Sequence, residues 1–477
     1  MLSKAIDRAS NVRAFRLIYC FLLFATGVYI GCWFLYNKPQ NNLLIPPTNR
    51  SLPSFIKPKE ALGLNCTSIY DDPKFNYSSY ESERVHVSGP QNEAELPMDC
   101  NSIRQRAYFH TEDLYPEEAE FPIAFARTVF MDYRLIEIDL AALYTPHNFY
   151  CYALDLKSAP LFHKRMNALA SCFPNVFIAE KKFSMNSKGH NMTYSQYQCM
   201  LTLSKPEYKW KYMVMLQNHD IPLKTNQEMI QIFKWFNGSN DVASWPAPKE
   251  RINPNVTWSF EDMHLFKNES RNRLVHNGHE PKMQFAKSMV HVSLSRAMIN
   301  FMLYDINFES ILKNFEWDAF AIDELIMASL NSADAIDPPG GFTTSCSKYK
   351  IAYWTMTRWE MWLWDVKNCS TIARHSVCIL GMEHLRVIAN VPQLFANKVI
   401  PSYDFGAAVC WYEEHFRRTH FDRGLHRLAS NIYLNLPHVL AFHLEVRFNR
   451  ERNRLGDKFN VTQFVCKSKD NETDRWH

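Results

Sequence analysis

The chain reads FPIAFARTVF at 121–130, FYCYALDL at 149–156, NVFIAE at 175–180 and KYMVMLQN at 211–218. Each run is mostly apolar and is bounded by proline, asparagine or charged residues. Nearly continuous apolar runs of this length are typical of strands buried on both faces, as in a parallel sheet covered by helices. The segments between the runs carry apolar residues at three- and four-residue spacing, which favours helices. The alternation predicts an α/β fold with a mostly parallel central sheet flanked by helices.

Polar residues that follow two of these runs are the first candidates for a functional site. In parallel sheets, ligands bind beyond the carboxyl ends of the strands. Asp155 follows the second run, and Asp220 and Lys224 lie in the polar turn QNHDIPLKTN that follows the fourth. Thr225 then opens TNQEMIQIFKWFN with Glu228 three positions later, a capping-box arrangement that predicts the start of a helix.

The N-terminal region predicts a membrane anchor. LIYCFLLFATGVYIGCWFLY (17–36) has no charged residue, and it corresponds to about 30 Å of helix, enough to cross a bilayer. Basic residues precede it, so the positive-inside rule places a tail (1–16) in the cytoplasm and the rest across the membrane. A cleaved signal peptide is the alternative, but its apolar core would be shorter and would end in a small-residue cleavage site.

The rest of the chain divides by composition. Residues 37–118 carry proline, asparagine and serine with weak periodicity, which indicates a luminal stem. Residues 119–477 are enough for one large luminal domain. Within it, another helix is expected near 312–331.

The cysteines and the glycosylation motifs agree with a luminal location. Of 12 cysteines, Cys20 and Cys32 lie in the apolar segment and ten lie beyond it, an even number that indicates disulfides in an oxidising compartment. The asparagines of N-x-S/T motifs, each a predicted glycosylation site, are Asn49, Asn65, Asn76, Asn191, Asn237, Asn255, Asn268, Asn368, Asn460 and Asn471. The net charge of +4, with no basic block beyond the N-terminus, gives no support for a nucleic-acid partner.

Four longer segments carry a resemblance to a known family. They are FPIAFARTVFMDYRLIEIDLAALYTPHNFYCYALDLKSAP (121–160), MNALASCFPNVFIAEK (166–181), WKYMVMLQNHDIPLKTN (210–226) and RHSVCILG…LFANK (374–398). In order and approximate spacing, over about 119–415, the chain resembles the core-2/I-branching β-1,6-N-acetylglucosaminyltransferases. The resemblance implies a type II Golgi membrane enzyme whose luminal catalytic domain has a GT-A-like, Rossmann-related fold. It also implies transfer of GlcNAc from UDP-GlcNAc to the 6-hydroxyl of an acceptor glycan or glycoprotein, with inversion of the anomeric carbon.

An inverting transfer needs one carboxylate as general base for the attacking hydroxyl. The resemblance assigns this role to Glu324, in the acidic pair with Asp323 that opens a helix. Ala321 and Ile322 replace the Ser-Pro that often precedes the pair in the family. A helix N-terminus favours the carboxylate form that a base must start from. The alternative is a solvent-facing charge pair at the start of a helix.

The departing UDP diphosphate needs positive charge, which many GT-A enzymes supply with a metal held by an Asp-x-Asp motif. No two aspartates of this sequence have that spacing, and the family resembled is metal-independent, so no metal cofactor is expected. The resemblance assigns the charge to Lys398 and to a basic position before Ser-Val-Cys, where His375 stands with Arg374 one residue earlier. Arg374 is favoured over His375, because arginine is permanently charged and can bind a phosphate bidentately.

The resemblance also suggests donor and acceptor contacts. Asp155 matches a carboxylate that binds uracil or ribose, with a helix cap as the alternative role. Asp220 matches a donor-side or site-shaping position, with a structural turn as the alternative. The stretch NSKGHNMTYS (186–195) and the residues before Asp220 depart from the family pattern, so the exact donor stays open. The residues placed where the family binds its acceptor are Lys249, Arg251, Trp354 and Trp359, although the tryptophans could instead pack the core.

By the same resemblance, the expected disulfides are Cys100–Cys172, Cys151–Cys199, Cys66–Cys410 and Cys369–Cys378, which leaves Cys346 and Cys466 as a fifth pair. Two other functions remain open on the sequence. One is a related O-xylosyltransferase that uses UDP-xylose, and the other is a non-catalytic glycan-binding protein, for which His375 in place of arginine is the only support.

Overall fold

The structure is a computed structural model that describes residues 53–72, 74–87, 96–273, 280–343, 355–364, 369–422, 424–425 and 427–443. These residues belong to one compact unit that begins at Pro53. Several expectations fall outside the described residues, namely the anchor at 17–36, Trp354, Cys346, Cys466, Asn49, Asn368, Asn460 and Asn471. Within the described residues, no helix combines the length and the apolar character needed to span a bilayer.

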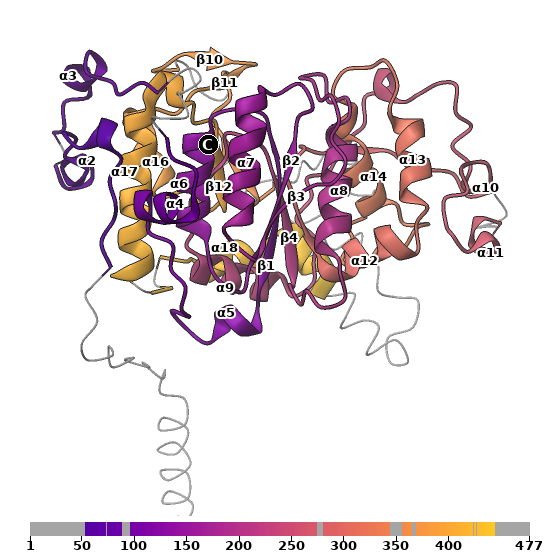
Figure 1. The fold of residues 1–477 in the computed structure, drawn as a ribbon. Coiled ribbons are helices and arrows are strands. Elements are labelled where there is room, and N and C mark those ends of the chain that lie inside the picture. Colours follow the sequence, from indigo (N-terminus) through magenta and orange to yellow (C-terminus); the bar gives the residue numbers. More distant parts are fainter. Residues whose placement is uncertain are drawn as a thin grey trace, which may run out of the picture. The chain divides into compact units, whose positions relative to one another are not determined.

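A five-stranded sheet forms the centre of the unit, with the strand order β3-β2-β1-β4-β8 (Figure 1). Its strands are β1 (Ile123–Val129), β2 (Phe149–Leu154), β3 (Val176–Ile178), β4 (Tyr212–Leu216) and β8 (Val292–Ser295). The first four are parallel, and β8 runs antiparallel to β4 at the edge. The four predicted strands are therefore confirmed at their predicted places, whereas the antiparallel edge strand was not predicted.

Helices cover both faces of this sheet. Side chains of β1 alternate between the faces, since Ala124 and Ala126 join one core cluster and Ile123, Phe125 and Val129 join another. Figure 1 shows α6 and α7 on one side of the sheet and α8, α12 and α14 on the other. The bounds of these helices are α6 (Tyr133–Leu143), α7 (Pro160–Ser171), α8 (Met192–Leu203), α12 (Arg296–Tyr304) and α14 (Ile326–Ser332). The next helix, α9 (Asn226–Phe236), begins with the predicted capping box of Thr225 and Glu228.

A second, smaller sheet has the order β5-β12-β9, and a two-stranded hairpin lies beside it. The strands are β5 (Ile221–Pro222), β12 (Phe395–Asn397) and β9 (Arg358–Glu360), and the hairpin is β10 (Ala373–Arg374) with β11 (Val377–Cys378). The last long helix, α17 (Pro401–His420), packs in a third core cluster with residues of β5 and β12.

The segment expected to form one helix near 312–331 is broken in the structure. It forms α13 (Phe308–Phe315), a loop, the 3-10 turn η4 (Ile322–Glu324) and α14. Ala321 has a left-handed backbone (φ 55°), and Glu316 in the loop accepts a hydrogen bond from the backbone N–H of Asn191 (2.9 Å). This tertiary contact holds the loop out of the helix and places the acidic pair Asp323 and Glu324 just before α14.

The other elements are short. They are η1 (Lys59–Ala61), α2 (Cys66–Asp71), α3 (Tyr77–Glu81), α4 (Cys100–Arg106), α5 (Glu117–Glu120), β6 (Trp245–Pro246), η3 (Lys249–Arg251), α10 (Phe260–Met263), α11 (Glu269–Asn272), β7 (Ala286–Lys287), η5 (Met382–His384), α16 (Leu385–Ile388) and α18 (Ser430–Leu434). Ala61, Cys66, Ile69 and Tyr80 are buried in the third core cluster. Described residues of the expected stem (37–118) thus form part of the folded body.

Four disulfides occur in the described residues, and two of them fasten the early helices α2 and α4. The described residues contain Cys66–Cys410, Cys100–Cys172, Cys151–Cys199 and Cys369–Cys378, the four pairs that the resemblance implied.

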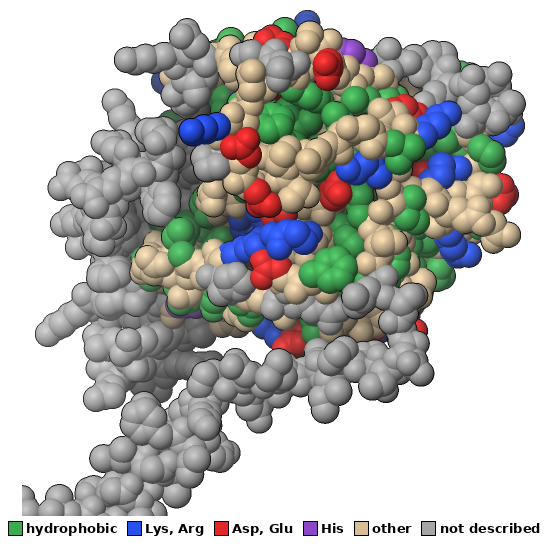
Figure 2. Space-filling model, turned by 90° about the vertical axis from the view of Figure 1, so that its left-hand side faces the viewer, with side chains coloured by type: hydrophobic (Ala, Val, Ile, Leu, Met, Phe, Trp, Pro, Cys, Tyr) green, Lys and Arg blue, Asp and Glu red, His purple; other side chains and the backbone are tan. Residues whose placement is uncertain are grey.

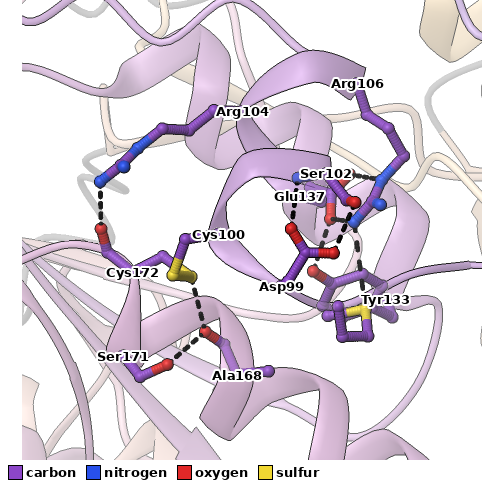
Figure 3. The surroundings of a disulfide bond; sticks show 11 residues. Asp99, Cys100, Ser102, Arg104, Arg106, Tyr133, Glu137, Ala168, Ser171 and Cys172 are labelled. Atoms are coloured by element: carbon purple, nitrogen blue, oxygen red, sulfur yellow. Dashed lines mark hydrogen bonds and ion pairs between the residues drawn. A yellow bond between two sulfur atoms is a disulfide. The ribbon is translucent and has the colours of Figure 1, made fainter.

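Figure 3 shows the surroundings of Cys100–Cys172, which joins α4 to the end of α7. Asp99 caps α4 through the N–H of Ser102, and Arg106 forms two hydrogen bonds to Glu137 of α6 (2.8 and 2.7 Å). On the side that carries α2, α3 and α17, Figure 2 shows basic and acidic side chains interspersed with apolar ones.

Candidate active site

The candidate site lies at the carboxyl edge of the central sheet. The strand order reverses between β1 and β4, the point at which ligands bind in open α/β sheets. Asp155 follows β2, and residues 217–220 follow β4. Because β8 is antiparallel to β4 and Val292 pairs with Met215, the residues just before β8 lie at this same edge.

Asp155 is almost buried (9% exposed), and one of its oxygens is occupied by the protein. Its Oδ1 accepts hydrogen bonds from the backbone N–H groups of Lys157 (3.0 Å) and Met185 (3.3 Å), and Oδ2 lies 3.9 Å from the Lys157 ammonium. The carboxylate therefore fixes the loop before α7 against the segment that leads into the 186–195 loop.

Asp220 is fully buried and both of its oxygens are used internally. Oδ1 accepts from Asn397 Nδ2 (2.8 Å) and Arg358 Nη1 (3.1 Å), and Oδ2 accepts from the Gln217 N–H (2.6 Å). These contacts join the end of β4 to β9 and β12, so Asp220 shapes the site from within. Lys224 is likewise buried, and its ammonium donates to the Val391 carbonyl (2.6 Å).

Three basic side chains come together beside this junction. Lys398 follows β12, Arg374 ends β10, and His375 starts the turn of the hairpin with a positive φ of 54°. Burial lowers the pKa of half-buried Lys398, and the nearby charges of Arg358 and Arg374 lower it further. Burial, Lys398 and Arg374 also lower the pKa of His375, so this ring is mostly neutral near pH 7.

Arg358 has acidic partners within salt-bridge distance, whereas Lys398 and Arg374 do not have such partners among the described residues. Arg358 is neutralised by Asp220 and by Glu360, whose Oε1 lies 2.5 Å from Nη2. Neither Lys398 nor Arg374 forms a salt bridge with any residue in the described part of the chain. Two neighbouring cations with no salt-bridge partner among these residues make a site that favours an anion.

Glu324 lies at the end of η4 and is held between two cations. Its Oε2 is 2.7 Å from Arg251 Nη1 and 3.2 Å from Lys287 Nζ, and the side chain is 19% exposed. Its carbonyl accepts the N–H of Ser288 (2.7 Å). The acid is thus a partly exposed carboxylate, positioned by both its backbone and its side chain.

One short segment connects the carboxylate to the basic group. Ser288 is hydrogen-bonded to Glu324, and His291, three residues later, is buried near Arg358, whose charge adds to burial in lowering the pKa of the ring. Three residues of chain span at most about 11 Å. The structure therefore brings Glu324 and the Lys398–Arg374 group to the same edge of the sheet.

Asp323, beside Glu324, faces a different neighbour. It is 8% exposed, and a Cβ added at Gly189 (φ 92°) would lie 2.0 Å from its Oδ1. The Lys188 carbonyl accepts the N–H of Ala321 (2.7 Å). The 186–195 loop consequently packs directly on the turn that carries the acidic pair.

The predicted acceptor residues are not all at the site. Arg251 contacts Glu324, whereas Lys249 is exposed at the start of η3. Arg358 and Glu360 contact one another on one face of β9, so Trp359 points to the other face, where it packs against the third core cluster. The position of Trp359 is that of a packing residue, the alternative left open by the sequence.

Several residues at the site were missed by sequence reasoning. Lys287, Arg358 and Glu360 contact the predicted residues directly. The alternation of charges around Trp359 in TRWEMW was a usable sign for Arg358 and Glu360, but nothing near Lys287 distinguished it from a surface lysine. No group of three or more potential metal ligands occurs among the residues that the structure describes.

Comparisons with known proteins agree with this architecture. The model of the family described as Core-2/I-Branching enzyme matches residues 123–389. The Danio rerio protein named beta-1,3-galactosyl-O-glycosyl-glycoprotein beta-1,6-N-acetylglucosaminyltransferase 4 is 29% identical over 410 residues, 80% of this chain and 91% of its own length. The Homo sapiens N-acetyllactosaminide beta-1,6-N-acetylglucosaminyl-transferase is 30% identical over 309 residues, 63% of this chain and 73% of its own. A parallel-dominated sheet flanked by helices fits a GT-A-like fold, and the chain is a glycosyltransferase that belongs to the core-2/I-branching enzyme family.

Proposed function

We propose that this chain transfers GlcNAc from UDP-GlcNAc to the 6-hydroxyl of an acceptor sugar, with inversion and without a metal ion. The observation that carries the proposal is the pair of cations, Lys398 and Arg374, without a salt-bridge partner among the described residues, at the same edge of the sheet as the carboxylate of Glu324. The relatives named as β-1,6-N-acetylglucosaminyltransferases support the choice of donor and linkage.

In this mechanism Glu324 takes the proton of the acceptor 6-hydroxyl as its oxygen attacks the anomeric carbon. The bond between that carbon and the UDP oxygen breaks, and the electron pair leaves with UDP. Arg251 and Lys287 contact Oε2 of Glu324, so we assign the proton to Oε1. The two contacts fix the orientation of the Glu324 side chain.

Lys398 and Arg374 would receive the diphosphate. Because the lowered pKa of His375 makes its ring mostly neutral, we assign the second charge to Arg374. Such fixed cations stabilise the negative charge that develops on the leaving group, an effect worth about 10²–10³ in kcat for one well-placed donor. Asp155 would contact the uridine, with its backbone hydrogen bonds holding the carboxylate in place.

We also propose that the chain is a Golgi membrane protein of type II topology, anchored by residues 17–36. The apolar segment, the N-x-S/T motifs and the disulfides support this location.

The test is release of UDP by the full-length chain with UDP-GlcNAc and a panel of acceptor glycans, in the presence of EDTA. Turnover that survives EDTA and falls at least about 100-fold in Glu324→Gln is the expected result. Glu309→Gln is the matched control, because Glu309 is exposed at the start of α13. A strict manganese requirement contradicts the role of Lys398 and Arg374. Activity with UDP-xylose but not with UDP-GlcNAc favours the O-xylosyltransferase. If neither donor releases UDP, the result favours a glycan-binding protein.

A further inference from the structure

A stacked pair of tryptophans lies in the segment that follows β9. The rings of Trp362 and Trp364 stack with their centroids 4.4 Å apart and an interplanar angle of 15°. Trp364 is 66% exposed. An indole with one face supported by another ring and much of its surface in solvent is an uncommon use of the largest apolar side chain.

The segment that bears these rings is fixed by pairing with the hairpin. Leu363 N–H donates to the Ser376 carbonyl (3.0 Å), and Cys378 N–H donates to the Met361 carbonyl (2.9 Å). Trp362 pairs with Val377, and Cys378 is joined to Cys369 by a disulfide. The stacked pair is therefore held on a rigid ladder, which lowers the entropy lost when a ligand binds.

The geometry also relates the stack to the proposed diphosphate site. In an extended chain, every second residue lies on one face, so Arg358, Glu360 and Trp362 form one row, and the chain then turns at Leu363 and Trp364. The ion pair between Arg358 and Glu360 agrees with this arrangement, and Trp364 stacks on Trp362 from the turn that follows. The row begins near Lys398, because the charges of Arg358 and Glu360 both act on its ammonium, and Trp362 lies about 7 Å along the chain from Glu360.

Arg374 lies on the same face. It pairs with Val377 across the hairpin, as Trp362 does from the other side, and residues directly opposite one another in a ladder project to the same face. Trp362, Val377 and Arg374 thus form a cross-strand line that connects the aromatic stack to the cation assigned to the diphosphate.

We infer that Trp362 and Trp364 form an acceptor subsite that stacks a pyranose ring of the acceptor glycan, beyond the sugar that receives GlcNAc. The apolar face of C–H groups on a pyranose complements an exposed indole, and Trp362 holds that indole flat. The inference rests on the proposed function only in its choice of a glycan as the ligand. Leu363 lies between the two tryptophans in the sequence and takes no part in the ring stack.

The test compares binding of the N-acetyllactosamine disaccharide and of the tetrasaccharide of two such units to the full-length chain by saturation-transfer NMR. The expected result is that the Kd ratio between disaccharide and tetrasaccharide falls by about 3- to 10-fold in Trp364→Ala. Trp364→Phe retains a ring and restores most of the ratio. Leu363→Ala, which removes a 43% exposed side chain from the same segment, leaves the ratio unchanged.

Three outcomes overturn the inference. In the first, the wild-type chain binds both glycans with the same Kd. In the second, the Kd ratio of Trp364→Ala equals that of Leu363→Ala. In the third, Trp364→Ala weakens UDP binding, which would make the stack a nucleobase contact, or reduces sedimentation with phosphatidylcholine vesicles, which would make it a membrane contact. Binding is measured without turnover, so an inactive chain that shows the expected Kd ratios refutes the proposed transferase activity and leaves the subsite intact. An active chain with an unmoved ratio refutes only the subsite.

Discussion

Asp323→Asn tests whether the buried member of the acidic pair is protonated in the folded protein. Burial, and next the charge of Glu324, raise the pKa of Asp323 from 3.8 to about 7. The native state therefore retains a proton that the unfolded chain releases as the pH rises above about 4. Stability contributed by this group falls with rising pH between about 4 and about 7 and changes no further above that range.

The magnitude follows from the pKa difference between the two states. At 1.36 kcal/mol per unit, ionisation of Asp323 lowers the free energy of unfolding by at most about 4 kcal/mol at pH 7.5 and by about 1 kcal/mol at pH 4.5. Asparagine has nearly the same shape and does not ionise, so Asp323→Asn removes this difference of about 3 kcal/mol. For a folded body of roughly 400 residues, that is a change of roughly 3–4 °C in Tm.

The assay is the Tm of variant minus wild type, measured by thermal unfolding at pH 4.5 and pH 7.5. We expect a gain that is larger by about 3 °C at pH 7.5 than at pH 4.5. Asp318→Asn, an exposed change on the same loop, controls for general charge effects and should show no such pH dependence. Equal differences at the two pH values, or equal behaviour of the two variants, would refute the protonation of Asp323.

Three further predictions concern the site and its loop. Lys398→Ala and Arg374→Ala should each lower kcat for UDP release by about 10²–10³ while the Tm changes little, because each removes a charge from the leaving group. Gly189→Ala should lower the free energy of unfolding by about 2 kcal/mol in denaturant titrations, since φ is 92° and its new Cβ would lie 2.0 Å from Oδ1 of the buried Asp323 side chain. Peptide mapping after deglycosylation should find Asn255 occupied and Asn191 unoccupied, because Asn255 is exposed whereas the Asn191 amide donates to a backbone carbonyl (2.9 Å).

The sequence predicted those parts of the fold that local pattern controls. The four parallel strands and the capping box at Thr225 are where the apolar runs and the polar turn placed them. Strands buried on both faces must be apolar at every position, so their pattern is visible without knowledge of the partners. The break between α13 and α14 was missed, because it depends on Glu316 contacting a loop more than 100 residues earlier in the chain.

The second sheet was also beyond sequence reasoning. β5, β12 and β9 have two or three residues each and lie far apart in the sequence. Strands this short carry no periodicity, and what stabilises them here is the buried carboxylate of Asp220, which contacts Arg358 and Asn397. No motif or periodicity in the sequence marks Arg358 or Asn397 as a partner of Asp220.

The sequence by itself therefore determined the α/β class and the family, and it nominated Glu324, Lys398 and Arg374 as site residues, because these follow from local patterns and motifs. Only the tertiary structure decided which charges are neutralised and which stay available. Among the residues that the structure describes, Arg358 has salt-bridge partners and Lys398 has none, Trp359 packs against the core, and Trp364 is exposed. Pairing and exposure depend on residues that are distant in the chain, and that information exists only once the chain has folded.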